Sequence, residues 1–329
     1  MSTAYVLLLV SLAPWLACAQ GNGCAAFQSA LKSTYDFKPA KLSGADRESK
    51  SAAMDKIWAE VKADPKELAP CLESALEDPG ADAWFLFDGS GLLLMVDPSP
   101  EANQLILRGC EKVDFDDIDL SEWIRRLTRL AIADIDISTA AARWMAYPNP
   151  RYVLPRHAFT ANKADGAFFL YGSMDEAQAT PALQRIVSDV SHPARSVALE
   201  LLSQQLTPQS LDVLHSLDHS GFPTDTRKAV ERALKSPQTL QPRLHPKTTR
   251  AEFVSAFQAI VNRDFGPFMD LVEKVPDGEK DVVAVMSPAD LPLIRKVRRC
   301  LAATGNPHQM DMYPFFTRII QTLLSAKSA

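Results

Sequence analysis

Two groups of side chains have types and spacings that suit metal ions, and each lacks part of a complete ligand set. His215 and His219 are four residues apart, which would put both imidazoles on one face of a helix. No further ligand completes a zinc site around them, and a histidine near the end of a helix is favourable there without any metal. The run Asp114–Asp119 holds four carboxylates, but Asp119 stands where a calcium-binding loop needs glycine. We therefore expect no metal site and no cofactor.

The triplet Gly89-Ser90-Gly91 has the residue types of a nucleophile elbow or a phosphate-binding loop. Its spacing fits neither, because the elbow needs five positions and the phosphate loop needs a lysine that is missing. The triplet lies in Ala83–Met95, the most apolar stretch after the N-terminus, which predicts a core helix interrupted or kinked by glycine. We expect no catalytic residue here. Trp84 and Phe87 in this stretch are candidates for an aromatic groove that binds a partner.

A loop with regularly spaced prolines, Tyr147–His157, carries three further candidates. Arg151, Arg156 and His157 lie close together in it, and loops often hold binding residues. These side chains could bind a carboxylate or phosphate group of a partner, although the loop could equally be a simple connector.

Helices must position these residues, because apolar side chains recur at three- and four-residue spacing through most of the chain. Prolines stand repeatedly at the starts of such segments, where they suit the first helical turn. Only Asp281–Met286 alternates like a strand, and it is short enough to be a buried helix instead. The sequence predicts an all-α protein.

Two pairs of segments repeat one pattern. Pro181–Val190 and Pro208–Leu217 place apolar side chains on the same helix face, and Arg195–Leu202 and Arg227–Leu234 match in the same way. These residues resemble HEAT repeats, in which a first helix opened by Thr-Pro is followed by a short turn and a second helix with an early arginine.

The resemblance implies an α-α superhelix, a solenoid of helical hairpins with a concave surface for partner proteins. We expect the HEAT-like solenoid to span residues 20–236. Three prolines within Pro237–Pro246 forbid a regular helix, so a proline-rich linker is expected at 237–250. A C-terminal helical unit at 251–329 would complete the chain.

The N-terminus has the pattern of a cleaved export signal. Residues 1–19 have no charged side chain, an apolar run and a small-residue ending, Ala17-Cys18-Ala19. This pattern predicts a secreted or periplasmic protein. A lipid anchor on Cys18 is the minor alternative. No later stretch approaches the length that crosses a bilayer.

Four cysteines remain after removal of this segment, which allows three pairings in an oxidising compartment. In an elongated stack of helices, residues distant in sequence are distant in space, and a disulfide needs its two Cα atoms within about 7 Å. Cys24–Cys71 is therefore the preferred disulfide, and a bond from Cys110 to Cys300 is disfavoured. Cys300, on an apolar helix face, is expected to be a buried thiol.

Composition excludes some functions. The 329 residues carry a net charge of −5, which argues against nucleic acid as a partner. The basic run Arg295–Arg299 is expected to be one solvated helix face. With no complete catalytic set, the sequence favours a non-enzymatic exported scaffold for protein–protein interaction. The alternative is a hydrolase that acts on the cell envelope, which would need two carboxylates in one cleft about 5–9.5 Å apart.

Overall fold

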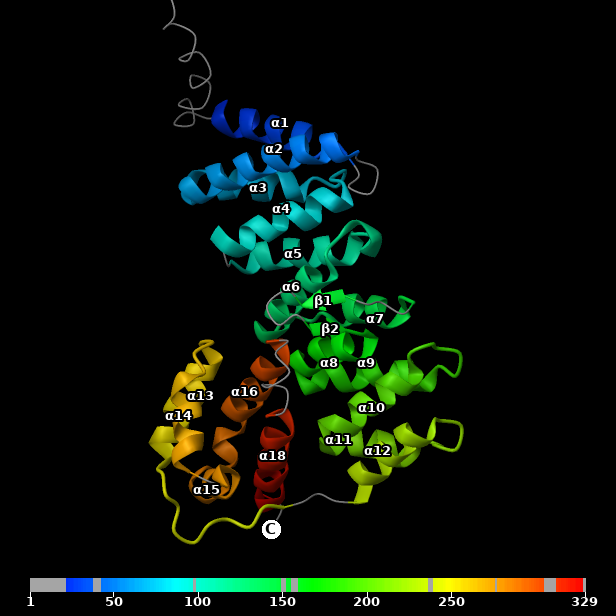
Figure 1. The fold of residues 1–329 in the computed structure, drawn as a ribbon, viewed down its shortest axis with the longest axis vertical. Coiled ribbons are helices and arrows are strands. Elements are labelled where there is room, and N and C mark those ends of the chain that lie inside the picture. Colours follow the sequence, from blue (N-terminus) through cyan, green and yellow to red (C-terminus); the bar gives the residue numbers. More distant parts are fainter. Residues whose placement is uncertain are drawn as a thin grey trace, which may run out of the picture. The chain divides into compact units, whose positions relative to one another are not determined.

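The structure, a computed structural model, describes residues 22–37, 43–96, 99–148, 152–154, 159–235, 239–275, 277–304 and 312–327. The predicted signal, with Cys18, lies outside these residues. The described chain is almost entirely helical (Figure 1), which confirms the predicted all-α class. It forms two compact units, unit 1 (Met1–Asp119) and unit 2 (Leu120–Ala329).

Unit 1 is a succession of helices, each packed on its neighbours in the chain (Figure 1). Its helices begin at polar caps: the hydroxyl of Ser99 accepts a hydrogen bond from the backbone N–H of Ala102 at 3.0 Å, and Pro100 follows in the first turn. Asp64 caps α3 in the same way. The elements are α1 (Asn22–Thr34), α2 (Gly44–Ala63), α3 (Pro65–Glu77), α4 (Ala83–Val96), α5 (Pro100–Lys112) and the 3-10 helix η3 (Phe115–Asp117).

The centre of unit 1 is α4, which runs without interruption through its two glycines. Ten consecutive residues, Phe85 to Leu94, are buried, so this helix is covered on all sides. Its one carboxylate, Asp88, accepts a hydrogen bond from the Tyr35 hydroxyl at 2.5 Å, because a buried carboxylate needs a partner. The predicted core helix is confirmed, and its glycines do not break it.

The disulfide of unit 1 joins Cys24 on α1 to Cys71 on α3, with their Cα atoms 5.3 Å apart. This is the pairing that the sequence favoured. Cys110 and Cys300 are free and buried, and burial raises the pKa of the Cys300 thiol. The prediction of a buried thiol at Cys300 is confirmed.

In unit 2, α16 and α18 lie between α8–α12 on one side and α13–α15 on the other (Figure 1). The strand-like pattern at 281–286 is helical over 281–285, in α15, and Met286 follows the end of that helix. The helices are α6 (Leu120–Ile132), α7 (Ser138–Ala146), α8 (Lys163–Ser173), α9 (Glu176–Ser188), α10 (Arg195–Gln205), α11 (Pro208–Ser216), α12 (Thr224–Lys235), α13 (Arg250–Val261), α14 (Gly266–Lys274), α15 (Gly278–Val285), α16 (Leu291–Ala303) and α18 (Tyr313–Lys327), with the 3-10 helix η4 (Pro288–Asp290).

A small antiparallel hairpin interrupts the helices where the sequence indicated a loop. Strands β1 (Tyr152–Leu154) and β2 (Phe159–Ala161) pair with Tyr152 opposite Ala161. Three residues per strand are too few to show the period-two pattern by which strands are found in a sequence.

The basic run of α16 is not the solvated face that its sequence suggested. Arg298 and Arg299 are only 2% and 6% exposed. Arg299 donates to the carbonyls of Ser173, at 2.8 Å, and Ala131, and to the Asp134 carboxylate at 2.7 Å. The expectation fails because the partners stand on α6, α8 and the turn after α6, more than 120 positions away in the chain.

Arg298 fixes α16 to a second set of neighbours. It donates to the carbonyl of Gln205 at 3.2 Å and to Glu176, and its guanidinium lies over the ring of Tyr313, 5.0 Å from the ring centre. These contacts tie α9, α10 and α18 to one helix. The two buried arginines therefore hold the C-terminal helices onto the middle of the chain.

The predicted linker contains no helix over its described residues 239–249. The helices on both sides of it belong to unit 2, and α16 packs on α8 and α6. Along the chain, unit 1 ends at Asp119 and unit 2 begins at Leu120; the division at 237–250 into a solenoid and a C-terminal unit stays a prediction.

Candidate functional site

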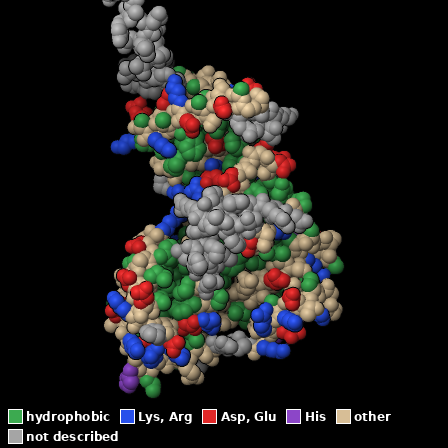
Figure 2. Space-filling model, viewed as in Figure 1, with side chains coloured by type: hydrophobic (Ala, Val, Ile, Leu, Met, Phe, Trp, Pro, Cys, Tyr) green, Lys and Arg blue, Asp and Glu red, His purple; other side chains and the backbone are tan. Residues whose placement is uncertain are grey.

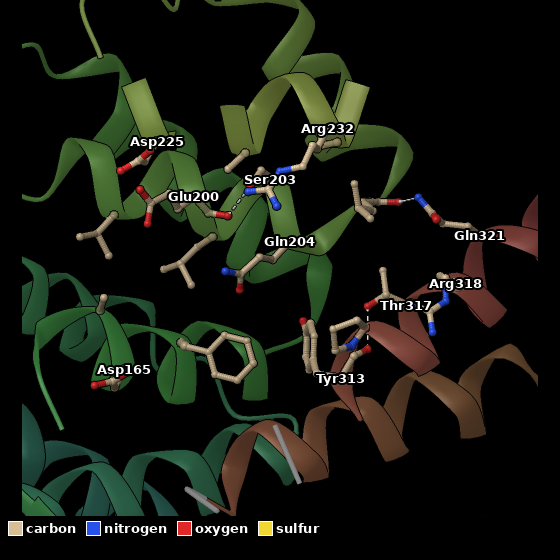
Figure 3. A pocket seen from close by; sticks show the side chains of 18 residues that line it. Asp165, Glu200, Ser203, Gln204, Asp225, Arg232, Tyr313, Thr317, Arg318 and Gln321 are labelled. Atoms are coloured by element: carbon tan, nitrogen blue, oxygen red, sulfur yellow. Dashed lines mark hydrogen bonds between the residues drawn. The ribbon is translucent and has the colours of Figure 1, made fainter. Parts of the chain in front are cut away.

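Unit 2 contains an open groove of about 920 Å³ between four helices, α8, α10, α12 and α18 (Figure 3). The size is near the upper end for ligand sites. Its lining residues are Ala164, Asp165, Phe168, Val197, Glu200, Leu201, Ser203, Gln204, Leu206, Asp225, Ala229, Arg232, Ala233, Tyr313, Pro314, Thr317, Arg318 and Gln321.

Each wall of the groove is one face of a helix. On α12 the lining residues are Asp225, Ala229, Arg232 and Ala233, at the spacing of three, four and seven residues that brings side chains to one side of a helix. The other three helices contribute residues at the same spacing. Because each face mixes apolar and polar residues, the groove is amphipathic.

Hydrogen bonds hold the polar side chains at the base of the groove. Ser203 donates to the carbonyl of Glu200 at 2.7 Å, and Thr317 donates to the carbonyl of Tyr313 at 3.0 Å. Gln321 bonds the carbonyl of Leu206 at 3.4 Å and so links α18 to the end of α10. The base is therefore formed by side chains that already have partners within unit 2.

Two aromatic rings form the apolar part between α8 and α18. Phe168 meets Tyr313 edge to face, with ring centres 5.0 Å apart, a favoured aromatic geometry. Tyr313 is 5% exposed, and the guanidinium of Arg298 also lies over its ring, 5.0 Å from the ring centre. The buried arginine of α16 therefore helps to fix the aromatic pair.

Three carboxylates, Asp165, Glu200 and Asp225, stand toward one side of the groove (Figure 3). They come from three helices. Glu200 accepts a hydrogen bond from the Thr226 hydroxyl at 2.7 Å, and Asp165 accepts one from the backbone N–H of Asn162 at 2.8 Å in the cap of α8. Among the described residues, no lysine, arginine or histidine forms an ion pair with any of the three. Negative charge therefore accumulates there.

Arginines occupy the rest of the polar rim. Arg232 is exposed and donates to the backbone carbonyl of Lys228 at 3.2 Å. Arg318 forms an ion pair with Glu279 on α15, and this pair raises the pKa of the Arg318 guanidinium. Figure 3 shows the order from the three carboxylates, through Arg232 and Gln204, to Arg318 and Gln321. The groove is charge-polarised along its length.

The aromatic candidates from the sequence lie in unit 1. Trp84 and Phe87 are neighbours, with ring centres 6.3 Å apart, and Phe37 lies 6.5 Å from Trp84. Phe87 is buried at 3% exposure and Trp84 is half-buried. Of the two, only Trp84 presents area that a partner could reach.

The remaining sequence candidates do not form a site that the structure describes. Arg151, Arg156 and His157 lie outside the described residues. His219 lies in the loop after α11, whereas His215 is on that helix, so the two imidazoles do not share a helical face. Asp114 caps η3 by accepting from the backbone N–H of Asp116. In the described part of the chain, no group of three or more histidine, cysteine or acidic side chains could hold a metal ion.

The groove residues gave no signal in the sequence. Asp165, Glu200, Asp225 and Arg232 are spread over four helical turns on three helices, and each alone resembles an ordinary surface residue. The available clue was the resemblance itself, since it predicts a concave surface along such helices without saying which residues line it.

Charged side chains of both signs are interspersed with apolar ones over the surface of unit 2 that faces the viewer in Figure 2. Among the described residues, no helix combines the length and the apolar character that a membrane span requires.

Comparison of the chain with protein-family models, with curated proteins and with solved structures finds no match.

Proposed function

We propose that the chain is an exported scaffold of HEAT-like helical hairpins that binds a partner protein through the groove of unit 2. The observation that carries the proposal is an amphipathic groove built from four helix faces. Apolar area with a polar rim is the composition of protein-binding surfaces. In the proposed superhelix, the groove is part of the concave side.

Export is supported by two features. The charge-free apolar N-terminus predicts a cleaved signal. The Cys24–Cys71 disulfide fits an oxidising compartment, where such bonds persist. A secreted or periplasmic partner follows from this proposal.

The hydrolase alternative receives less support from the groove. Two of its carboxylates, Asp165 and Glu200, already hold hydrogen bonds within unit 2. Retaining and inverting glycoside hydrolases need two carboxyl groups beside the bond that is cleaved, and the one that acts as general acid must be protonated. Carboxylates tied to a helix cap and to a neighbouring threonine suit recognition of a charged surface better.

Site-specific photo-cross-linking tests the proposal. A photoreactive amino acid replaces Gln204, an exposed residue of the groove, in the full chain expressed in the cells that make it. A matched control carries the same group at Gln209, an exposed residue of α11 that is not part of the groove. We expect a protein adduct of defined mass from position 204 and none from position 209. Equal adducts from both positions, or none from 204, would count against the groove as a protein-binding site.

A further inference from the structure

We propose that the occupant of the groove is an amphipathic helix of the partner that carries an acidic residue and, seven residues later, a basic residue on one face. This inference rests on the proposed function, because it specifies the partner segment that the same groove receives. The charge order of α12 and the absence of a strand edge among the described residues of the walls support it.

The spacing comes from α12. Asp225 and Arg232 both line the groove and are seven residues apart, so their Cα atoms are about 10.5 Å apart along the helix axis. A partner helix laid beside α12 meets these charges with two residues of its own that are also seven apart. An extended peptide spans the same length in about three residues. The spacing in a bound segment therefore reports its conformation.

The walls favour a helix over an extended peptide. Every described lining residue lies in a helix except Leu206, which directly follows α10. The N–H and C=O groups inside a helix form hydrogen bonds with one another. The walls thus offer few backbone partners to an extended chain, which would leave its own amides unpaired. A helix brings its backbone hydrogen bonds with it.

The size and the small residues also suit a helix. Ala229 and Ala233 lie on the groove face of α12 around Arg232, and small side chains let a second helix approach closely. A two-turn cylinder about 10 Å wide occupies roughly 800 Å³, close to the 920 Å³ of the groove. Val197, Leu201 and Phe168 would then contact the apolar residues between the two charges of the partner.

Charge complementarity sets the direction of the partner helix. The carboxylates Asp165, Glu200 and Asp225 favour a lysine or arginine at one end of the partner helix. Arg232 favours a carboxylate near its other end. Cations are favoured toward the C-terminus of a helix and anions toward its N-terminus. A partner helix antiparallel to α12 satisfies both conditions, because its basic C-terminal part then lies beside Asp225.

Selection from a library of random 14-residue displayed peptides, with the full chain as bait, tests this inference. Parallel selections use the double variant Asp225→Lys and Arg232→Glu, in which two exposed groove charges are exchanged. The matched control is Asp212→Lys with Lys228→Glu, two exposed residues outside the groove on α11 and α12. All three proteins are compared by circular dichroism so that a folding defect is recognised.

We expect enriched peptides with an acidic residue followed seven positions later by a basic one, and apolar residues three or four positions in. Their enrichment should fall about tenfold on the exchanged variant and stay unchanged on the control. Charges three apart, indifference to the exchange, or no enrichment would overturn the inference. If position 204 still cross-links a protein in those cases, the scaffold function stands and only the helical, charge-ordered partner fails.

Discussion

At the scale of single residues, the two buried arginines of α16 hold unit 2 together. Replacing Arg299 with methionine nearly keeps the volume but removes the arginine donor of the buried Ser173 carbonyl and one of the two donors of the Ala131 carbonyl, which keeps the N–H of Asp134. An unsatisfied buried carbonyl costs about 1–3 kcal/mol and a lost hydrogen bond about 0.5–1.5 kcal/mol, so we expect unit 2 to lose roughly 2–4 kcal/mol of its free energy of unfolding. Urea denaturation followed by circular dichroism measures the loss.

Lys296→Met is the matched control on the same helix. Lys296 is 39% exposed and approaches Asp134 at 3.9 Å, and surface pairs of this kind contribute between about 0 and 1 kcal/mol. Equal effects of the two substitutions would show that Arg299 is not the residue that fixes α16.

The Arg250–Asp290 pair predicts a dependence of stability on pH. The hydrogen bond from Arg250 lowers the pKa of the buried Asp290 carboxyl below its usual value. A lowered pKa in the folded state stabilises the protein above the pKa of the unfolded state, about 3.9, and the stabilisation disappears as the pH falls through the lowered value. Asp290→Asn should therefore destabilise the protein by about 1–3 kcal/mol at pH 7, and the difference from the wild type should shrink below about pH 4.

Unfolding curves at pH 7 and pH 3 check this dependence. Arg250→Ala should reproduce the effect of Asp290→Asn, and the double variant should cost little more than either single variant. Additive effects, or a difference that grows as the pH falls, would contradict the assigned role of the pair.

The basic residues of α16 show what the sequence alone does not predict. Four basic side chains within five positions suggest a solvated face, and Arg295 and Lys296 are indeed partly exposed. Nothing in the neighbouring sequence reveals that Arg298 finds acceptors on α9 and α10 and that Arg299 finds them on α6 and α8. The charge pattern predicts that the segment is a helix. Whether a charged side chain is buried depends on partners from distant segments, which the fold places beside it.

At the scale of elements, the contact of α4 with α5 depends on Gly109. A β-carbon at this position would lie 2.7 Å from the carbonyl oxygen of Leu86 on α4, so Gly109→Ala must push the two helices apart. We expect a loss of about 1–3 kcal/mol from this overpacking. Gly44→Ala, at the start of α2 with no atom within 4 Å of the added carbon, is the control.

Thermal unfolding of the two alanine variants gives the comparison. The Gly44 variant should keep or slightly raise the melting temperature, since alanine favours helix over glycine. A Gly109 variant as stable as the wild type would mean that α4 and α5 are not in the close contact described.

The disulfide stabilises α1 against α3. Replacing both Cys24 and Cys71 with alanine opens a link across 47 residues, and we expect unit 1 to lose about 2–4 kcal/mol. A reducing agent should destabilise the wild type by a similar amount and leave the double variant unchanged. A wild-type protein whose unfolding ignores the reductant would contradict the disulfide.

The helices themselves could largely be predicted from the sequence, because their apolar spacing and caps are local. The repeat segment Pro208–Leu217 agrees with α11 to within one residue, and the segment Arg227–Leu234 lies inside α12. The boundary of α9 was missed because Pro181, expected in the first turn, lies inside that helix. The strands β1 and β2 were missed because they are only three residues long.

At the scale of the whole molecule, the sequence predicted a partner-binding surface but not the residues that form it. The resemblance to helical repeats predicted a partner-binding face, but the proposed residues Trp84 and Phe87 stand in unit 1, and Phe87 is buried. The groove joins α8 and α10 to α18, more than 100 positions later. Its assembly depends on the return of α16 and α18 to the middle of the chain, which the periodicity of the sequence does not encode.

The groove of unit 2 is the proposed binding site of the partner protein. Amide hydrogen exchange of the full chain, alone and with the protein cross-linked from position 204, tests whether the partner binds there. We predict slower exchange in the four groove helices, α8, α10, α12 and α18, and unchanged exchange in α1–α5. Protection confined to α1–α5, with the groove helices unaffected, would contradict binding of the partner in the groove.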